Sequence, residues 1–469
     1  MSHRKVQTLV IGAGPGGYVA AIRACQVGRK VTVVERENLG GVCLNVGCIP
    51  SKALIHAGTL YDDLMKGGPT MGLKTTGLEV DLPTLIGWKA GIVKRLTDGV
   101  GGLLKANKAD VVYGEALFTA KNAVQVTGKD GVETIEFDDC IVATGSKPIE
   151  LPEFKVDQKK VLDSTGALAC ETLPKRVVVL GGGYIGLEIG TFWRKLGAEV
   201  TVLEMMDSIL AGIEPECAKT VHRNLKKRKV DVRLKTRALS MGDAKGGGVE
   251  VRIEGPKGKE TIECDVVLST VGRVPLGREL GLKDVGVTVD DKGFVTVDNQ
   301  QKTSAPGIYA IGDIAGQPML AHKASHEGLV AAEVIGGKNV SRDYKCVPAV
   351  VFTDPEIASV GMTEEDAKNA GVDFQVGKFP FAASGRAMSL NHTDGFTKIV
   401  AEKGSGLIVG AHIVGAHASE IIAEMGLAIE MGATLEDVAL TVHAHPTLPE
   451  TIMEAAEAAM GQAVHIFQK

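Results

Sequence analysis

The sequence predicts an α/β protein in which two similar strand–helix–strand units are followed by a C-terminal region of α+β structure. Three observations support this fold class. A glycine-rich turn between a strand and a helix occurs twice, and a glutamate follows each copy at the same distance. After residue 346 the pattern changes to alternating apolar runs, which are typical of antiparallel strands, and then to a helical period.

The two glycine-rich units contain the same parts in the same order. Each has a short apolar strand, a GxGxxG turn, an apolar helix ended by a glycine, a second strand and a closing glutamate. In the first unit these parts are residues 8–11, Gly12, Gly14, Gly17, residues 18–27, Gly28, residues 31–34 and Glu35. In the second unit they are residues 177–180, Gly181, Gly183, Gly186, a helix that ends at Gly197, residues 200–203 and Glu204. The spacing between corresponding residues is constant, so we interpret the two units as a repeat.

The complete pattern predicts two Rossmann-like dinucleotide-binding domains. In this fingerprint the first glycine permits a tight turn, the second lets the backbone approach a pyrophosphate, and the third lets helix and strand pack closely. The phosphate lies at a helix N-terminus, where free N–H groups and the helix dipole favour an anion. A glutamate at the end of the second strand accepts hydrogen bonds from ribose hydroxyls and repels a 2′-phosphate. Glu35 and Glu204 therefore predict FAD or NAD, rather than NADP, at each site.

Further strand-and-turn segments mark the ends of these domains. They lie at residues 141–148, 266–270 and 307–316. The first two are similar to each other, and we expect them to close the first and the second dinucleotide-binding domain. In the C-terminal region, residues 397–400 and 407–414 predict an antiparallel sheet, and residues 418–431 predict an amphipathic helix.

The segment GGVCLNVGCIPSK, residues 40–52, contains two cysteines five positions apart, Cys43 and Cys48. In a regular helix this separation gives a rise of about 7.5 Å, whereas the Cα atoms of a disulfide lie roughly 4.4–6.8 Å apart. A bond between the two sulfurs therefore requires an irregular backbone, which Gly47 can supply. Pro50 suits the first turn of a helix that begins near Cys48.

This placement predicts different roles for the two cysteines. A helix N-terminus stabilises a thiolate at Cys48, and Lys52, one turn later on the same face, adds a positive charge. We therefore expect Cys48 to be the thiolate next to a flavin and Cys43 to exchange with the sulfur of a substrate. A pair of structural cysteines and a zinc site are the alternatives. Zinc requires about four ligands, and no nearby histidine or cysteine completes such a set.

Thiol exchange needs a base that takes the proton from the incoming thiol, and histidine titrates in the right pH range. The segment HAHPTLPE, residues 443–450, contains two histidines and a glutamate. Pro446 disfavours helix at His445, and a hydrogen bond from Glu450 to the imidazole would set its tautomer and raise its basicity. We expect His445 and Glu450 to form this acid–base pair. A histidine in a turn without such a role is the alternative.

Composition and charge argue against two other classes of protein. The formal net charge is −5, aromatic residues make up 4%, and no long basic run is present, which disfavours a nucleic-acid-binding surface. No stretch of about 18 apolar residues is present, so we expect no membrane span. The first strand begins almost at the start of the sequence and leaves no room for a targeting peptide, which predicts a cytoplasmic protein with reduced thiols. A mature organellar matrix form is the alternative.

The CxxxxC segment, the two fingerprints, AIGD at residues 310–313 and HPTLPE at residues 445–450 together resemble the flavin disulfide reductase family. The resemblance extends over nearly the whole chain, and it is strongest to the members that oxidise protein-bound dihydrolipoamide and reduce NAD. It implies an FAD-binding domain at residues 1–147, an NAD-binding domain at 148–270, a central domain that completes the FAD site at 271–345 and a dimerisation domain at 346–469. It also implies a homodimer that works with a lipoyl-bearing acyltransferase or a lipoyl carrier protein, in complexes that act on 2-oxo acids or glycine.

The resemblance implies a role for each residue of the redox site. Cys43 is the interchange thiol and Cys48 the flavin-side thiol. His445, paired with Glu450, reaches the disulfide from the other subunit of the dimer. No metal ion takes part.

The resemblance also implies cofactor contacts. Lys52 is expected beside the flavin N5 and paired with Glu188, and Asp313 is expected at the ribityl or phosphate part of FAD. The residues expected to contact FAD are Gly12, Gly14, Gly17, Glu35, Gly41, Lys52, Ala116, Thr144, Gly145, Ser146, Asp313, Met319, Leu320, Ala321 and His322. Those expected to contact NAD are Gly181, Gly183, Gly186, Glu188, Glu204 and Gly272.

The sequence departs from the family pattern at two positions. Val42 stands where threonine is commoner, and Pro449 stands where a polar residue is frequent, which could alter the helix start next to Glu450. A relative of glutathione reductase would use NADP, which Glu204 argues against, and a mercuric reductase would carry a C-terminal cysteine pair, whereas no cysteine follows Cys346. An NAD-linked reductase of another small disulfide and a non-catalytic FAD scaffold are the remaining alternatives.

Overall fold

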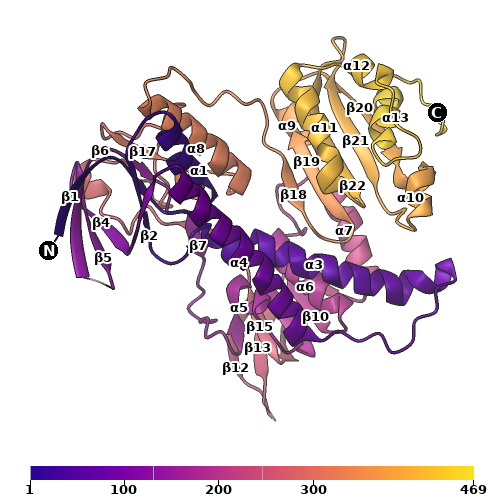
Figure 1. The fold of residues 1–469 in the computed structure, drawn as a ribbon. Helices are drawn as coiled ribbons and strands as arrows, with labels where there is room; N and C mark the ends of the chain where they lie inside the picture. The colour runs from indigo at the N-terminus through magenta and orange to yellow at the C-terminus, as the bar shows by residue number, and fades with distance from the viewer. Residues whose placement is uncertain (1, 130, 246, 469) are drawn as a thin grey trace. The chain divides into compact units, whose positions relative to one another are not determined.

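The computed structural model describes residues 2–129, 131–245 and 247–468. The chain divides into two units, which are described separately. The first consists of Met1–Leu54, Pro83–Ile149 and Gly272–Asp343, and the second of Ile55–Leu82, Glu150–Val271 and Tyr344–Lys469. Each unit contains a strand–helix–strand arrangement, and an α+β region follows at the C-terminus, which confirms the predicted fold class (Figure 1). This division does not test the four predicted domain ranges, which stay a prediction.

The first unit is built on a sheet in which β1, a strand with a buried C-terminal half, lies between two parallel neighbours, β2 and β6. The bounds of these strands are Ser2–Ile11 for β1, Val31–Glu35 for β2 and Gly131–Val142 for β6. Helix α1 (Pro15–Gln26) makes the crossover from β1 to β2. The apolar pattern predicts its start at residue 18, but the helix begins earlier, because Pro15 has the φ of a first helical turn.

The same sheet continues on both sides of these strands in the order β3-β2-β1-β6-β5-β4, and β17 also pairs with β6. The additional strands are β3 (Asp110–Tyr113), β4 (Glu115–Ala120), β5 (Ala123–Gly128) and β17 (Ile308–Ala310). Strands β4, β5 and β6 are antiparallel, whereas β17 is parallel to β6. A separate antiparallel pair joins β7 (Ser146–Pro148) to β16 (Arg273–Pro275). This pairing brings the end of the first predicted domain next to the start of the central one.

Helix α8 (Ala321–Ile335) packs along α1 in the first unit (Figure 1). A Cβ atom at Gly16 would lie 2.9 Å from the carbonyl oxygen of Ala324, and one at Gly328 would lie 2.7 Å from the carbonyl oxygen of Gly16. Only glycine at these two positions allows the helices to approach so closely. As a result, α8 lies directly beside the glycine-rich turn between β1 and α1.

The second unit contains a parallel sheet with the strand order β11-β10-β9-β15-β8. Its strands are β8 (Val161–Leu162), β9 (Arg176–Leu180), β10 (Glu199–Leu203), β11 (Asp231–Arg233) and β15 (Val266–Ser269), and its helices are α5 (Ser164–Leu168), α6 (Tyr184–Lys195) and α7 (Pro215–Lys227). An antiparallel sheet is formed by β12 (Arg237–Asp243), β13 (Val249–Gly255) and β14 (Gly258–Cys264). The elements β9, α6 and β10 repeat the arrangement of β1, α1 and β2, which confirms the predicted repeat.

The C-terminal part of the second unit is an antiparallel sheet with the order β18-β19-β22-β21-β20. Its strands are β18 (Ala349–Val351), β19 (Glu356–Gly361), β20 (Phe374–Pro380), β21 (Phe396–Glu402) and β22 (Ile408–Gly415). Its helices are α9 (Glu364–Asn369), α10 (Gly385–Ser389), α11 (Ala418–Met431), α12 (Leu435–Leu440) and α13 (Glu450–Ala459). Helix α11 packs on β19 and β22, and α13 packs on β20 and β21. The predicted antiparallel sheet is confirmed, and α11 has the bounds that the sequence predicts.

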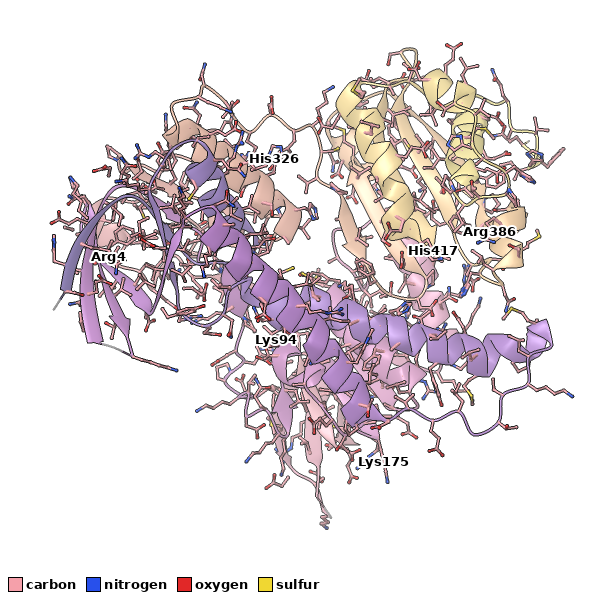
Figure 2. The ribbon with its side chains drawn as sticks, viewed as in Figure 1. Arg4, Lys94, Lys175, His326, Arg386 and His417 are labelled. Atoms are coloured by element: carbon pink, nitrogen blue, oxygen red, sulfur yellow. The ribbon has the colours of Figure 1, made fainter. Side chains whose placement is uncertain are left out.

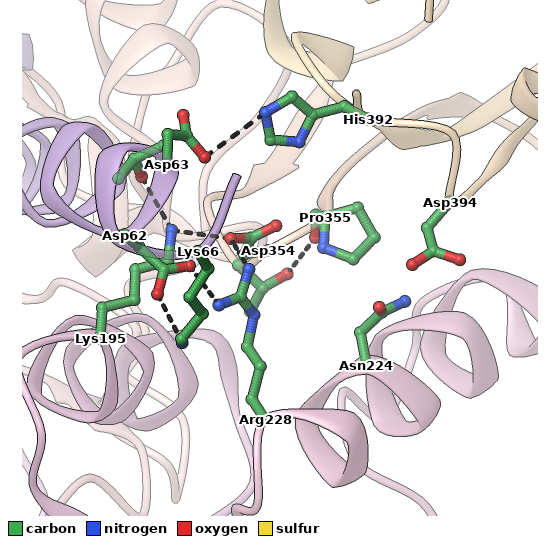
Figure 3. Close-up of polar contacts among 12 residues, drawn as sticks. Asp62, Asp63, Lys66, Lys195, Asn224, Arg228, Asp354, Pro355, His392 and Asp394 are labelled. Carbon is green, nitrogen blue, oxygen red and sulfur yellow. Dashed lines mark hydrogen bonds and ion pairs between the residues drawn. The ribbon is translucent and has the colours of Figure 1, made fainter. Parts of the chain in front are cut away.

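Helix α3 (Cys48–Asp62) begins in the first unit and ends in the second. A network of buried and partly buried charges holds its C-terminal end (Figure 3). Arg228 forms ion pairs with both Asp62 and Asp354, and Lys195 pairs with Asp354 at 2.7 Å. Within the second unit this network joins α3, the parallel sheet domain and the C-terminal sheet.

Helix α4 (Leu82–Ala106) is the longest helix in the described part of the chain. Neither α4 nor another described helix is both long enough and apolar enough to cross a membrane.

Candidate redox and dinucleotide sites

The first glycine-rich turn has the geometry that a dinucleotide fingerprint requires. Gly12 has φ +98°, and a Cβ atom there would lie 2.4 Å from the carbonyl oxygen of Ala143. A Cβ atom at Gly17 would lie 1.9 Å from the carbonyl oxygen of Gly12, so both positions exclude a side chain. At Gly14, in contrast, a Cβ atom would meet no described atom within 4 Å. The open space at Gly14, at the N-terminus of α1, therefore fits a pyrophosphate.

The second glycine-rich turn repeats this geometry. Gly181 has φ +97°, and a Cβ atom there would lie 2.7 Å from the carbonyl oxygen of Thr270. A Cβ atom at Gly186 would lie 2.8 Å from the carbonyl oxygen of Gly181, and at Gly183 it would meet no described atom within 4 Å. The N-terminus of α6 thus also fits a pyrophosphate, and both turns have the properties that the glycine spacing predicts.

The two predicted ribose-binding glutamates are held in the same way by the backbone. Oε2 of Glu35 accepts a hydrogen bond from the N–H of Ala13 at 2.7 Å, and Oε1 accepts one from the N–H of Glu37 at 2.8 Å. Glu204 accepts the two corresponding bonds at 2.7 and 2.8 Å. Each carboxylate is therefore oriented before a nucleotide binds, and its remaining lone pairs are suited to accept from ribose hydroxyls.

The cysteine segment lies directly against the first glycine-rich turn. Gly40 donates its N–H to the carbonyl oxygen of Ala13 at 2.8 Å, and a Cβ atom at Gly41 would lie 2.7 Å from the Cα atom of Gly14. Cys43 belongs to a short helix, α2 (Gly41–Asn45). Gly41, a predicted FAD contact, thus packs against Gly14 and brings the start of α2, the helix that carries Cys43, to the first glycine-rich turn.

Cys48 is the first residue of α3, which confirms the helix start that the sequence predicts. Gly47 separates α2 from α3, and a Cβ atom there would lie 2.9 Å from the carbonyl oxygen of Val42. Both cysteines are thiols, with Cys43 half-buried and Cys48 exposed. A hydrogen bond to Cys48, together with burial, raises the pKa of the Cys43 thiol. The proton of the reduced pair is thus favoured on Cys43. Val42, the first departure from the family pattern, is exposed on α2.

Asp313 and the predicted FAD-contact segment at residues 144–146 come together in the first unit. The hydroxyl of Ser146 donates to Oδ2 of Asp313 at 2.5 Å. Arg273 donates to the same hydroxyl from Nε at 2.8 Å and to the carbonyl oxygen of Ser146 from Nη2 at 2.6 Å. Sequence reasoning did not single out Arg273, although it lies in the GRVP segment that follows the second dinucleotide-binding domain.

The other predicted FAD contacts lie at separate places in the first unit. Ala116 is buried in β4, where it packs in the apolar core. Gly145 has φ +71° and follows β6. The four residues from Met319 to His322 lead into α8, with Leu320 at its N-cap and Ala321 as its first residue. Their contacts with FAD stay predictions.

His445 and Glu450 form the predicted pair in the second unit. His445 Nδ1 lies 2.8 Å from Oε1 of Glu450, and Oε2 accepts the N–H of Thr447 at 2.6 Å. Burial raises the pKa of Glu450, but the hydrogen bonds from Thr447 and His445 outweigh it and leave this pKa below its ordinary value. Glu450 is the first residue of α13, with Pro449 at the N-cap, so the second departure from the family pattern leaves the pair intact. The carboxylate fixes Nδ1 as the donor, which leaves the exposed Nε2 as the base.

A second histidine–glutamate pair lies beside the first, and sequence reasoning missed it. His443 Nε2 lies 2.9 Å from Oε1 of Glu424 on α11, and Nδ1 lies 2.8 Å from the carbonyl oxygen of Thr441. The side chain of His443 is buried, at 6% exposure. It therefore anchors the segment that carries His445 to α11. The residue spacing contains no signal of this contact, because Glu424 lies on a different element.

Two of the predicted contacts depend on how the units are placed. Lys52 lies in the first unit and Glu188 in the second, so their pair stays a prediction. Glu188 is buried, and its Oε1 accepts the N–H of Phe352 at 2.9 Å. Gly272, predicted to contact NAD, belongs to the first unit, where its carbonyl oxygen accepts the N–H of Ile149 at 3.0 Å.

Comparison with known protein families agrees with this geometry. Residues 6–328 match the family model described as pyridine nucleotide-disulphide oxidoreductase, and residues 347–456 match the dimerisation domain of the same family. The chain is 53% identical over 466 residues to a protein of Geobacillus stearothermophilus named dihydrolipoyl dehydrogenase, with 99% of this chain and 98% of that protein covered. It is 54% identical over 463 residues to the dihydrolipoyl dehydrogenase of Bacillus subtilis, with 98% of each covered.

Solved structures give the same result for the fold. The crystal structure of LpdA from Mycobacterium tuberculosis aligns with a TM-score of 0.89 at 30% identity and covers 96% of this chain and 99% of its own. The flavoprotein disulfide reductase RclA from Escherichia coli, described as induced by HOCl, aligns with a TM-score of 0.85 at 27% identity, with 96% and 99% covered.

Proposed function

This chain belongs to the pyridine nucleotide-disulphide oxidoreductase family, and on that premise we propose that it is an FAD-dependent enzyme that oxidises dihydrolipoamide and reduces NAD. The observation that carries the proposal is the thiol pair of Cys43 and Cys48, which begins directly beside the first dinucleotide turn. Relatives named dihydrolipoyl dehydrogenase, about half identical over nearly the whole chain, support the substrate. The carboxylates of Glu35 and Glu204 support FAD and NAD, because neither accommodates a 2′-phosphate.

We propose that the two cysteines exchange electrons with the substrate as a disulfide and a dithiol. One thiolate of dihydrolipoamide attacks Cys43, which breaks the Cys43–Cys48 bond and releases Cys48 as a thiolate. The second substrate sulfur then displaces Cys43, so that the substrate leaves as a cyclic disulfide and both cysteines are reduced. The N-terminus of α3 and the charge of Lys52 stabilise the thiolate at Cys48.

His445 takes the proton of the attacking thiol in this scheme and returns it to Cys43. Its Nδ1 is held by Glu450, so Nε2 is the atom that accepts the proton. The carboxylate also stabilises the imidazolium that forms, as expected for a glutamate whose pKa lies below its ordinary value. The family pattern assigns this histidine to the partner subunit.

The described residues fit both dinucleotides. The open space at Gly14, with Glu35 and Asp313, would hold FAD, and the open space at Gly183, with Glu204, would hold NAD. A bound FAD would supply the two-electron redox chemistry that links the reduced cysteines to NAD.

The dimerisation domain at residues 347–456 makes this chain a homodimer. Within the same domain, Leu427, Met431, Leu440 and Val442 are large apolar side chains that the single chain leaves exposed, as expected for a surface that a second subunit covers. We further propose that the dimer works with a lipoyl-bearing acyltransferase or lipoyl carrier protein, since the substrate arm must come from another chain. A cytoplasmic location is part of the same proposal, and cell fractionation tests it.

An assay of the purified chain tests the proposed function. We expect NAD-dependent oxidation of dihydrolipoamide, and about a hundredfold or greater loss in a Cys48→Ser variant. One equivalent of NADH should produce a long-wavelength thiolate–flavin band in the unaltered protein, because the electrons pass on to the disulfide and leave an oxidised flavin beside the thiolate. In the Cys48→Ser variant, which has no disulfide, it should bleach the flavin without this band. Efficient reduction of glutathione disulfide without turnover of lipoamide would instead favour a reductase of another small disulfide.

A further inference from the structure

Helix α8 connects the two parts of the proposed FAD site within the first unit. One side of the helix packs against the first glycine-rich turn, through the close glycine contact described above. An adjacent face of the helix contacts the turn at residues 312–316, which carries Asp313. His326 is exposed on this helix (Figure 2), whereas two charged residues of α8, Lys323 and Glu327, are buried.

Lys323 and Glu327 form a buried ion pair that is hydrogen-bonded to the backbone of the turn at residues 312–316. Their charged atoms lie 3.0 Å apart, and the side chains are 2% and 0% exposed. Oε2 of Glu327 accepts the N–H of Gly312 at 2.8 Å. Nζ of Lys323 donates to the carbonyl oxygens of Gly312, at 3.4 Å, and of Gly316, at 3.1 Å. The pair therefore holds peptide groups at both ends of the turn.

Stability alone does not account for such a pair. Removing two charges from water costs about as much free energy as their attraction returns, so a well-packed apolar pair would stabilise the fold at least equally. Arg342 also lies 3.2 Å from Oε1 of Glu327, which adds a further desolvated contact. What the charges provide is direction, because each hydrogen bond holds a peptide group of the turn in one orientation.

The side chain of Asp313 is held by a different set of residues. The hydroxyl of Ser146 donates to its carboxylate, and Arg273 in turn donates to that hydroxyl. The carboxylate is therefore oriented by one set of contacts and its backbone by another. Only the backbone contacts come from α8, the helix that also packs against the pyrophosphate turn.

We propose that Lys323 and Glu327 are positioning residues of the FAD site, which hold the turn at residues 312–316 so that Asp313 meets the cofactor in one geometry. This inference rests on the proposed function, because it requires that Asp313 contacts FAD. It assigns the two residues a role in cofactor affinity and flavin potential.

Titration of FAD-depleted protein with FAD, followed by quenching of flavin fluorescence, tests the proposal. In a Glu327→Gln variant we expect the dissociation constant of FAD to rise about tenfold, as for the loss of one charged hydrogen bond. The midpoint potential of the bound flavin should shift as well. A dissociation constant and a potential equal to those of the unaltered protein would overturn the proposal.

A double variant separates positioning from stability. In Lys323→Met/Glu327→Leu an apolar pair replaces the ion pair. The melting temperature of the FAD-depleted double variant should therefore be close to that of the unaltered protein, and above that of Glu327→Gln, in which Lys323 loses its charged partner. The FAD dissociation constant should remain raised, because an apolar pair directs no peptide group. Recovery of both properties would show that the pair acts only through packing and would overturn the proposal.

The buried pair of Lys398 and Glu214, 2.9 Å apart in the second unit, offers a matched control. Lys398→Met/Glu214→Leu should leave the FAD dissociation constant unchanged, and an equal rise there would overturn the assignment. The unaltered protein separates the two proposals. If it binds no FAD, the proposed function fails and this inference fails with it. If it binds FAD and the Lys323 and Glu327 variants bind FAD with the same dissociation constant, only this inference is contradicted.

Discussion

Glu204 ends β10 with both carboxylate oxygens already engaged by backbone N–H groups. The side chain is therefore oriented for recognition of a ribose without an added conformational cost. A carboxylate at the end of this strand is also expected to repel a 2′-phosphate. We therefore propose that Glu204 selects NAD over NADP in the second unit.

A Glu204→Gln variant should lose this discrimination. We expect kcat/KM for NAD to fall about tenfold, since a charged hydrogen bond to ribose is lost, while kcat/KM for NADP stays equal or rises. Steady-state kinetics with both nucleotides measures the ratio. Glu35→Gln is the matched control, because Glu35 makes the same two backbone bonds in the first unit. A similar change of the ratio in both variants would contradict the assignment of Glu204.

The pair of His445 and Glu450 leads to a second prediction at the residue scale. A Glu450→Gln variant keeps the shape of the side chain but cannot stabilise an imidazolium, so dihydrolipoamide oxidation should fall about a hundredfold. Transfer of electrons from NADH to an artificial dye does not require this base and should be unchanged. Glu457→Gln on the same helix is the control. Equal loss in both assays would mean that Glu450 acts on folding rather than on proton transfer.

At the scale of elements, the contact of α13 with β20 determines where Glu450 stands. Gly377 in β20 has no room for a side chain, since a Cβ atom would lie 1.9 Å from the carbonyl oxygen of Ala455 and 2.5 Å from the N atom of Ala459. Helix α13 lies directly on the strand backbone there. Because Glu450 is the first residue of α13, the position of the acid–base pair depends on this packing.

A Gly377→Ala variant should displace the helix. We expect a loss of about 1–3 kcal/mol in the free energy of unfolding, as for other overpacked cores, together with reduced dihydrolipoamide oxidation. Chemical denaturation and the same enzyme assay measure the two effects. Gly102→Ala in α4 is the control, because a Cβ atom there meets no described atom within 4 Å. That exchange should stabilise the helix by about 0.5–1 kcal/mol. If Gly377→Ala and Gly102→Ala destabilised the protein equally, the close contact of α13 with Gly377 would not be the cause.

At the scale of the whole molecule, the charge network around Asp354 makes the stability of the second unit depend on pH (Figure 3). His392 lies 3.5 Å from Asp63, and this hydrogen bond raises the pKa of the histidine above its ordinary value, against the opposing effect of burial. Burial raises the pKa of Asp354, but Lys195 and Arg228 outweigh it and leave this pKa below its ordinary value. The two groups therefore stabilise the fold in different pH ranges.

The ion pair of His392 with Asp63 should stabilise the folded state at acidic pH and not at alkaline pH. Because the pKa of His392 is higher in the folded state, its stabilisation is complete below the unfolded value of about 6.5 and is lost as the pH rises through the folded value. We expect His392→Gln to be less stable by about 0.5 kcal/mol at pH 5.5, since the pair is partly exposed, and equally stable at pH 8.5. Thermal unfolding of both proteins across this range measures the difference, and a constant difference would contradict it.

The contribution of Asp354 to the stability of the fold should show the opposite dependence on pH. Since the pKa of Asp354 is lower in the folded state, its stabilisation is present above the unfolded value of about 3.9 and is lost as the pH falls through the folded value. Asp354→Asn leaves Lys195 and Arg228 without this partner and should cost about 3 kcal/mol at neutral pH. Acid titration of unfolding should show that the difference shrinks below pH 4. A difference that persists at pH 2 would argue for a packing effect.

The repeated units, the start of α3 and the pair of His445 with Glu450 could be predicted from the sequence. Their physical causes are local. A glycine is required where φ is positive or a backbone approaches, a proline favours a first helical turn, and a glutamate five residues after a histidine reaches its ring when a turn lies between them. Such constraints act between residues close along the chain, so spacing alone reveals them.

Other contacts were decided only by the tertiary structure. Glu424 with His443, Arg273 with Ser146, and Glu327 with Gly312 join residues on different elements. Whether such side chains meet depends on the register and packing of helices against strands, and many residue types satisfy the same local pattern. The sequence by itself determined the chemistry of each turn and helix start, because these follow from backbone conformation. The tertiary structure decided which charged residues hold those turns in place, because a buried charge is stable only where packing brings a partner to it.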